Sequence, residues 1–169
     1  MKLLTLLSLF ALAVVARAET TLTMTGVHNC CGSCAKGITK AGTSVGDVTV
    51  TVPEKSGTVT IVAKKKGDAQ KAVDAIIAAG YFGKVEGAEP AAAPSSTKPE
   101  STLAKATVSG VHLCCKKCVT AAEDAVKSVA GVTKYEIVSK ADSFTVEGEF
   151  TKSALAAALN SAGFAGDIK

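Results

Sequence analysis

The six cysteines of this 169-residue chain fall into two groups that have the same spacing. They are, in order along the chain, Cys30, Cys31, Cys34, Cys114, Cys115 and Cys118. Each group lies in a nine-residue segment, GVHNCCGSC or GVHLCCKKC, and six of the nine positions are identical. Thiolates select soft ions such as Cu(I), Zn(II), Hg(II) or Cd(II) over hard ions. A CxxC pair can direct both sulfurs at one ion, so each segment predicts a soft-metal site.

These segments belong to a duplication that runs through most of the chain. A second pair of matching segments, Ala79-Gly80-Tyr81 and Ala162-Gly163-Phe164, is offset by 83 residues, against 84 for the cysteines. Residues 88–101 between the copies are rich in Pro, Ala and Ser, a composition typical of a semi-rigid linker. The sequence therefore predicts two domains, 19–87 and 102–169, joined by that linker.

Each copy predicts the element order β-α-β-β-α-β. In the first copy, alternating apolar residues predict a strand over 20–27, and a helix follows the cysteines. Strands over 48–52 and 58–64 precede a second helix, and a short last strand begins at Tyr81. The second copy repeats the pattern, and its last strand begins at Phe164. This order predicts an α+β fold with helices on one face of an antiparallel sheet.

The first 18 residues have the pattern of a secretory signal peptide. Lys2 precedes an apolar run over 3–16, and Ala16-Arg17-Ala18 supplies a small-x-small cleavage site. The run is too short to span a bilayer comfortably, which favours cleavage over an uncleaved anchor. We therefore expect a protein exported to the periplasm or the extracellular space.

Removal of this segment would leave 17 basic residues against 15 acidic ones, and every basic residue would be lysine. Arginine is the side chain that most often reads bases and clamps phosphates, so nucleic-acid binding is disfavoured. No Ser-His-Asp set, phosphate-binding glycine loop or pair of carboxylates can be assembled from the sequence. We expect a binding protein that is not an enzyme and has no membrane span after processing.

A CxxC between the first strand and first helix of this element order resembles the heavy-metal-associated domain. That family occurs in copper chaperones, mercury-binding periplasmic proteins and the N-terminal domains of metal-transporting P-type ATPases. The resemblance implies two tandem ferredoxin-like sandwiches and a metal-transport or metal-accepting protein as partner. It also implies the ligands, which are Cys31, Cys34, Cys115 and Cys118.

Some positions beside the ligands depart from the family or allow two roles. The family usually has a Met two residues before the first ligand, where this chain has Asn29 or Leu113. Cys30 and Cys114 directly precede the first ligands. Each acts either as a small buried apolar side chain or as a third thiolate.

Aromatic and basic side chains near the cysteines also allow two interpretations. His28 and His112 are interpreted as surface histidines, with metal ligation as the alternative. Tyr81 and Phe164 are expected to cap the cores, or else to support the metal ligands. The pair Lys116-Lys117 between the second set of ligands is expected to lower the pKa of those thiols, unless both ammonium groups turn into water.

The sequence favours a soft-metal-binding protein, with Cu(I) as the first choice because two thiolates suit an ion of low coordination number. Zn(II), Hg(II) and Cd(II) remain alternatives. A thiol–disulfide exchange module and a metal-free interaction domain with structural disulfides are the other classes. Because the linker is long, we expect the two sites to fill independently.

Processing gives the first testable prediction. The mature chain should begin at or near Glu19, directly after the small-x-small pattern. Intact-mass spectrometry of the exported protein measures this, and a mass that still includes residues 1–18 would contradict it.

Overall fold

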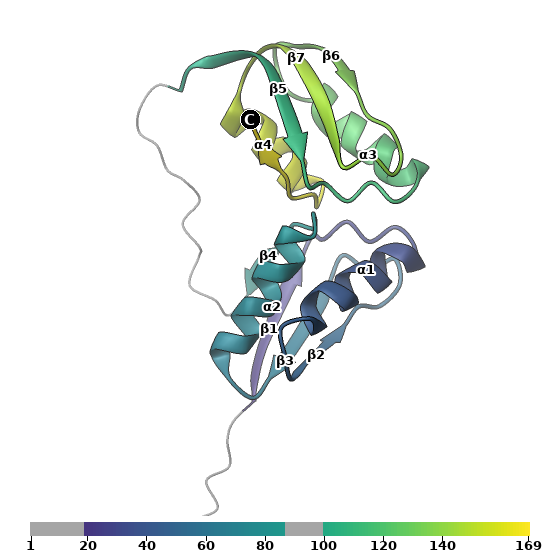
Figure 1. The fold of residues 1–169 in the computed structure, drawn as a ribbon, viewed down its shortest axis with the longest axis vertical. Helices are drawn as coiled ribbons and strands as arrows, with labels where there is room; N and C mark the ends of the chain where they lie inside the picture. Colours follow the sequence, from purple (N-terminus) through teal and green to yellow (C-terminus); the bar gives the residue numbers. More distant parts are fainter. Residues whose placement is uncertain (1–18, 87–99) are drawn as a thin grey trace, which may run out of the picture.

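The computed structural model describes residues 19–86 and 100–169, which form two separate folded domains (Figure 1). The expected signal peptide over 1–18 and the expected linker up to residue 99 lie outside the described residues. Among the described helices, none has the length and apolar character needed to cross a bilayer.

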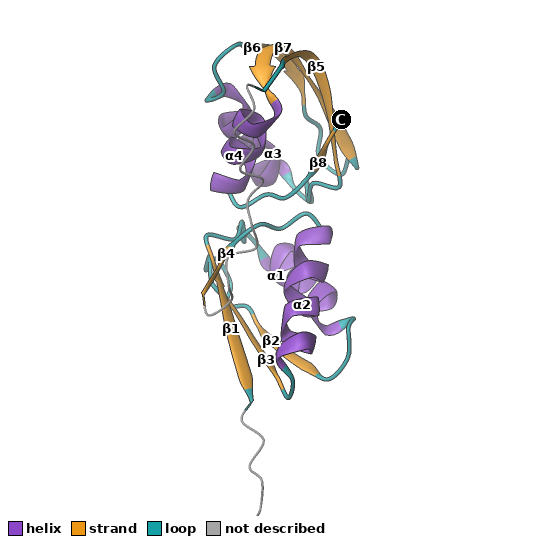
Figure 2. Cartoon of the chain, turned by 90° about the vertical axis from the view of Figure 1, so that its left-hand side faces the viewer, coloured by secondary structure: helices purple, strands orange, loops and turns teal. Residues whose placement is uncertain are grey.

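The first domain contains β1 (Thr20–Thr25), α1 (Gly32–Thr43), β2 (Val48–Thr51), β3 (Val59–Ala63), α2 (Lys66–Ala78) and β4 (Lys84–Glu86). Its four strands form an antiparallel sheet in the order β2-β3-β1-β4. Both helices cover one face of this sheet (Figure 2).

The second domain repeats this arrangement. It contains β5 (Thr102–Ser109), α3 (Lys116–Lys127), β6 (Val132–Glu136), β7 (Ser143–Thr151), α4 (Lys152–Ser161) and β8 (Asp167–Ile168). Its antiparallel sheet has the order β6-β7-β5-β8, which is the same topology. The predicted α+β fold of two tandem ferredoxin-like β-α-β-β-α-β sandwiches is therefore confirmed.

The last strand of each domain begins later than the sequence predicts. β4 starts at Lys84 and β8 at Asp167, three residues after Tyr81 and Phe164. Tyr81 and Phe164 instead pair with each other in an isolated antiparallel bridge between the two domains. The apolar pattern at these positions was correct, but the pairing partner lies in the other domain and not in the same sheet.

The alternating residues of β1 enter the core as predicted, because Leu22 and Met24 are buried. α1 packs closely against its neighbours at two glycines, a residue type with low helix propensity. A Cβ at Gly42 would lie 2.7 Å from Val50 Cγ2, and a Cβ at Gly37 would overlap the Tyr81 hydroxyl. These glycines therefore let α1 approach its neighbours closely.

The second domain has alanine in place of glycine at one of these positions. Ala121 corresponds to Gly37 at the offset of 84 residues, and Phe164 corresponds to Tyr81 at the offset of 83. Phe164 has no hydroxyl, so α3 accommodates the extra methyl group of Ala121. The two copies have changed the helix residue and the aromatic residue together.

The two domains lie end to end, so that their cysteine loops face each other (Figure 1). Their sheets lie on opposite sides of the molecule, as Figure 2 shows. One domain is thus turned relative to the other, which gives the chain an approximate twofold arrangement.

The pairing of Gly37 with Tyr81 can be tested by a double-mutant cycle. Gly37→Ala should lower the free energy of unfolding of the first domain by about 1–3 kcal/mol, because the new methyl group overlaps the hydroxyl. In a Tyr81→Phe background the same change should cost little or nothing. Chemical denaturation under reducing conditions measures both effects.

The matched control is Gly67→Ala in α2, where a Cβ meets no atom within 4 Å. That change should be neutral or stabilising, because alanine favours a helix more than glycine does. Equal losses for Gly37→Ala in both backgrounds would show that the hydroxyl is not the constraint.

Candidate metal centre

Backbone hydrogen bonds join the two domains around the cysteine loops. The carbonyl oxygen of Gly163 accepts hydrogen bonds from His28 N at 3.3 Å and from Phe82 N at 3.0 Å. The carbonyl of Gly80 accepts from Ala165 N at 3.0 Å. Gly80 and Gly163 follow the last turns of α2 and α4, with φ of 91° and 82°, as expected of glycines at a helix C′ position.

Two aromatic stacks reinforce this interface. His28 stacks on Phe164 with ring centroids 4.4 Å apart, and His112 stacks on Tyr81 at the same distance. Each stack joins a histidine of one domain to the aromatic residue of the other. The interpretation of both histidines as surface residues was therefore wrong, because the domain interface shields the Nε2 atom of each ring.

Each CxxC pair sits at the start of a helix. Cys31 and Cys115 are the N-cap residues of α1 and α3, and Cys34 and Cys118 lie in the first turns. The first turns carry no acidic residue. Unpaired N–H groups and the positive end of each helix dipole therefore favour thiolates at this place.

Each cysteine loop is hydrogen-bonded to the segment that joins two strands of its own sheet, β2 to β3 in the first domain and β6 to β7 in the second. The Asn29 side chain donates hydrogen bonds to the carbonyls of Pro53, at 2.9 Å, and Ser56, at 3.0 Å. Leu113, its counterpart, is buried, and its carbonyl accepts a hydrogen bond from Lys140 N at 2.6 Å. Asn29 and Leu113 thus fix the loops by different contacts at the position where the family usually has Met.

All six sulfurs lie together between the domains. Sulfurs of one CxxC pair are 3.7 Å apart in both domains, and sulfurs from different domains approach to 3.6–4.0 Å. Cys34 and Cys118 form the buried centre, at 3.9 Å from each other, and the other four are partly exposed. The sequence predicts two separate sites, whereas the structure places their residues in one cluster.

Sequence reasoning missed this cluster because the contact between domains depends on the interface and not on the CxxC spacing. A signal was present in the duplicated Gly-Tyr and Gly-Phe segments, which carry the interface. The vicinal cysteines Cys30 and Cys114 lie within the cluster, and His28 Nδ1 or Nε2 lies within 4.8 Å of the Cys30 and Cys118 sulfurs.

Hydrogen bonding between the central thiols separates their acidities. A hydrogen bond from Cys118 favours the thiolate of Cys34 and lowers its pKa, while the same contact raises the pKa of Cys118. Burial raises the pKa of Cys30 to about 12 and also raises the pKa of Cys114. The cluster therefore concentrates negative charge on few sulfurs.

Cys115 has a lowered pKa of about 7, and its main cause is the backbone N–H of Cys118. The N–H of Lys117 contributes, but the two exposed lysine side chains of Lys116 and Lys117 are not among the largest causes. The start of the helix, and not the lysine pair emphasised by the sequence, therefore accounts for this shift.

A polar group of the first domain also remains without a partner at the cluster. The Tyr81 hydroxyl is buried and makes no hydrogen bond. Burial raises the pKa of Tyr81, and the nearby sulfurs raise it further, so the phenol stays protonated. Tyr81 caps the core, as expected, and also brings an unused donor close to the cysteines.

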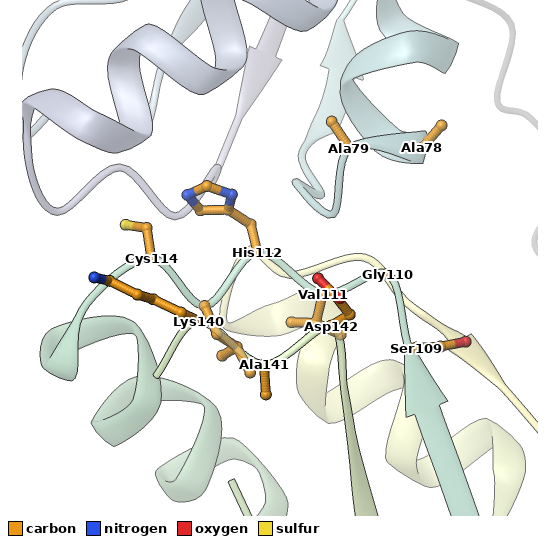
Figure 3. Close-up of a pocket in the computed structure, with 11 residues that line it drawn as sticks. Ala78, Ala79, Ser109, Gly110, Val111, His112, Cys114, Lys140, Ala141 and Asp142 are labelled. Carbon is orange, nitrogen blue, oxygen red and sulfur yellow. The ribbon is translucent and has the colours of Figure 1, made fainter. Parts of the chain in front are cut away.

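An open groove of about 490 Å³ reaches the cluster from one side. Figure 3 shows Cys114 on its wall, with Lys140 beside it and His112 projecting toward the first domain. Ala78 and Ala79 of the first domain line the opposite wall. The sulfur of Cys114 is thus accessible to an ion or a small thiol.

The sulfur spacing fits a soft metal ion. A point equidistant from three sulfurs with 3.7 Å sides lies about 2.1 Å from each, close to the ~2.3 Å of a zinc–thiolate bond. Three sulfurs can therefore bind one ion with a shift of only a few tenths of an ångström. The donor set consists of thiolates, which suits soft ions.

A family model for the heavy-metal-associated domain matches residues 105–165. The second domain is therefore similar to the heavy-metal-associated domain. This match covers the second domain, and the first domain repeats its topology and its CCxxC segment. The family match and the cysteine cluster support metal binding.

Solved structures with similarity to the chain include heavy-metal-associated domains. The apo HMA domain of a copper chaperone for superoxide dismutase is 20% identical, with 49% of this chain and 85% of that chain covered and a TM-score of 0.36. The N-terminal soluble domains of Bacillus subtilis CopA are 18% identical, with 90% and 95% covered and a TM-score of 0.34. No curated protein matches the chain.

The acidity of Cys115 predicts an order of alkylation in the metal-free protein. A pKa lowered to about 7 leaves about half of Cys115 as thiolate at pH 7, against about 1% for the ordinary value of 9.0. Cys115 should therefore react before Cys30 and Cys114, and its rate should fall as the pH drops below 7. Mass spectrometry of alkylated peptides measures the rates.

The control variant is Lys116→Gly with Lys117→Ser. It should keep Cys115 the faster residue, because backbone N–H groups are the main cause of the shift. If Cys115 no longer reacted faster than Cys30 and Cys114 in this variant, the lysine side chains would be the cause of its lowered pKa.

Proposed function

We infer that this chain is an exported protein that binds, sequesters or hands over a soft metal ion, with Cu(I) as the favoured cargo. The observation that supports this function best is the meeting of six free sulfurs at the positive ends of two helices. Thiolates held this close together repel one another, and a soft cation removes that repulsion.

The arrangement of sulfurs favours Cu(I) over Zn(II). Several sets of three sulfurs lie within 4.0 Å of one another, but no set of four sulfurs makes all six such contacts. Structural zinc sites take four ligands in a tetrahedron. An ion that needs only two or three thiolate ligands, such as Cu(I), therefore requires less rearrangement of the sulfurs. Hg(II) and Cd(II) remain alternatives.

The proposed ligands are Cys31, Cys34, Cys115 and Cys118, with thiolates of Cys30 and Cys114 as additional ligands. The buried sulfurs of Cys34 and Cys118 hold an ion away from water, and the partly exposed sulfurs give a partner access. Ligand exchange at such sulfurs suits transfer to a metal-transport or metal-accepting protein. The apolar segment over 3–16 supports export.

Thiol–disulfide exchange is the second candidate, and one observation favours it. Cys115 combines a pKa lowered to about 7 with partial exposure and a second sulfur 3.7 Å away at Cys118. An accessible thiol of low pKa beside a resolving cysteine is the arrangement of redox-active pairs. A metal-free interaction domain with disulfides is the third class, although all six cysteines are free here.

Metal analysis of the mature protein, purified without oxygen and reconstituted with Cu(I), distinguishes these classes. The expected result is about two Cu(I) per chain held against a competing chelator, with the loss of free thiols on metal binding. The matched control replaces Cys31, Cys34, Cys115 and Cys118 by Ser and should retain neither ion. Reversible thiol oxidation near −200 to −270 mV without Cu(I) retention would support the exchange module instead.

A further inference from the structure

The six sulfurs divide into two triangles, and each triangle takes sulfurs from both domains. The first triangle consists of Cys31, Cys34 and Cys114, with sulfur–sulfur distances of 3.7, 3.6 and 4.0 Å. The second consists of Cys115, Cys118 and Cys30, with all three distances at 3.7 Å. Every cysteine of the chain is used once, and the approximate twofold relation exchanges the triangles.

Each vicinal cysteine completes a triangle of sulfur contacts of 4.0 Å or less with the CxxC pair of the other domain, whereas in its own pair it contacts only the second cysteine. Cys31 has φ and ψ of −161° and 168°, and Cys115 has −153° and 170°, so both are extended. Consecutive side chains of an extended segment point to opposite sides. Cys30 accordingly lies 3.7 Å from both Cys115 and Cys118 of the other domain. Within its own loop it contacts Cys34, at 3.8 Å, and makes no such contact with Cys31.

The interface holds the two loops in this register. The stacks of His28 on Phe164 and His112 on Tyr81 each join the two domains. A Cβ at Gly163 would overlap backbone atoms of His28 and Gly26, so the domains approach each other without a side chain between them. The cross-domain contacts of the sulfurs therefore follow from a packed interface.

We propose that each metal ion is bound by three thiolates, two from the CxxC pair of one domain and the third from the vicinal cysteine of the other. Cys114 completes the site of Cys31 and Cys34, and Cys30 completes the site of Cys115 and Cys118. This arrangement rests on the proposed metal binding and adds that the metal joins the two domains. Ion binding and domain docking are then thermodynamically linked.

Two three-cysteine variants of the mature chain test this arrangement. The cross-domain variant carries Cys30→Ala, Cys115→Ala and Cys118→Ala, and retains one triangle. The same-domain variant carries Cys114→Ala, Cys115→Ala and Cys118→Ala, and retains all three cysteines of the first loop. The variants have equal numbers of thiols and differ only in which vicinal cysteine remains.

The cross-domain variant should bind one Cu(I) with three sulfur neighbours, as measured by X-ray absorption spectroscopy. Its affinity in a chelator competition should exceed that of the same-domain variant by about tenfold or more, because the third ligand is already in place. The same-domain variant should show two sulfur neighbours.

Equal affinities with equal sulfur coordination, or a tighter same-domain variant, would overturn the arrangement. If the unsubstituted chain also fails to retain Cu(I), the proposed function itself is wrong, so the two failures are distinguishable. The mirror pair of variants guards against misfolding of the first domain. It retains Cys115 and Cys118 with either Cys30 or Cys114, and Cys30 should give the tighter, three-coordinate site.

Discussion

The face-to-face burial of two cysteine loops is the contact on which the rest of the structure depends. Each loop leaves a helix N-terminus and three thiols at one end of a small domain. Docking of the ends covers both with the stacks of His28 on Phe164 and His112 on Tyr81. The interface thereby buries the thiols of Cys34 and Cys118 and the Nε2 atoms of both histidines, and it leaves the other four thiols partly exposed.

The close approach of the two domains requires glycines at the interface and is accompanied by close packing inside the first domain. Gly80 and Gly163 present bare backbone to the opposite domain, because a side chain at either position would meet its main chain. Inside the first domain, Gly37 makes space for the Tyr81 hydroxyl, whereas the second domain combines Ala121 with Phe164. The copies have thus kept the same packing with different pairs, and only the first carries a buried phenol beside the sulfurs.

Charge is the second constraint on the cluster. Thiols 3.6–4.0 Å apart cannot all ionise together in a partly buried place, and this accounts for the opposite pKa shifts of Cys34 and Cys118. The helix N-termini favour thiolates, while burial and neighbouring sulfurs oppose them. A soft cation or a disulfide resolves this conflict, so the same geometry is compatible with metal binding and with thiol exchange.

The sequence by itself determined the duplicated β-α-β-β-α-β order, because apolar periodicity, terminal glycines and the repeated cysteine segment are local signals. It also placed Cys31 and Cys115 at the start of their helices. The tertiary structure alone decided that the two cysteine groups meet. Tyr81 and Phe164 pair across the interface instead of starting strands, and His28 and His112 are covered instead of solvated, because both outcomes depend on contacts between residues of different domains. The spacing within a segment determines which sulfurs of one loop can point the same way. Only the packing of one domain on the other determines which sulfurs of the two loops lie in the same cluster.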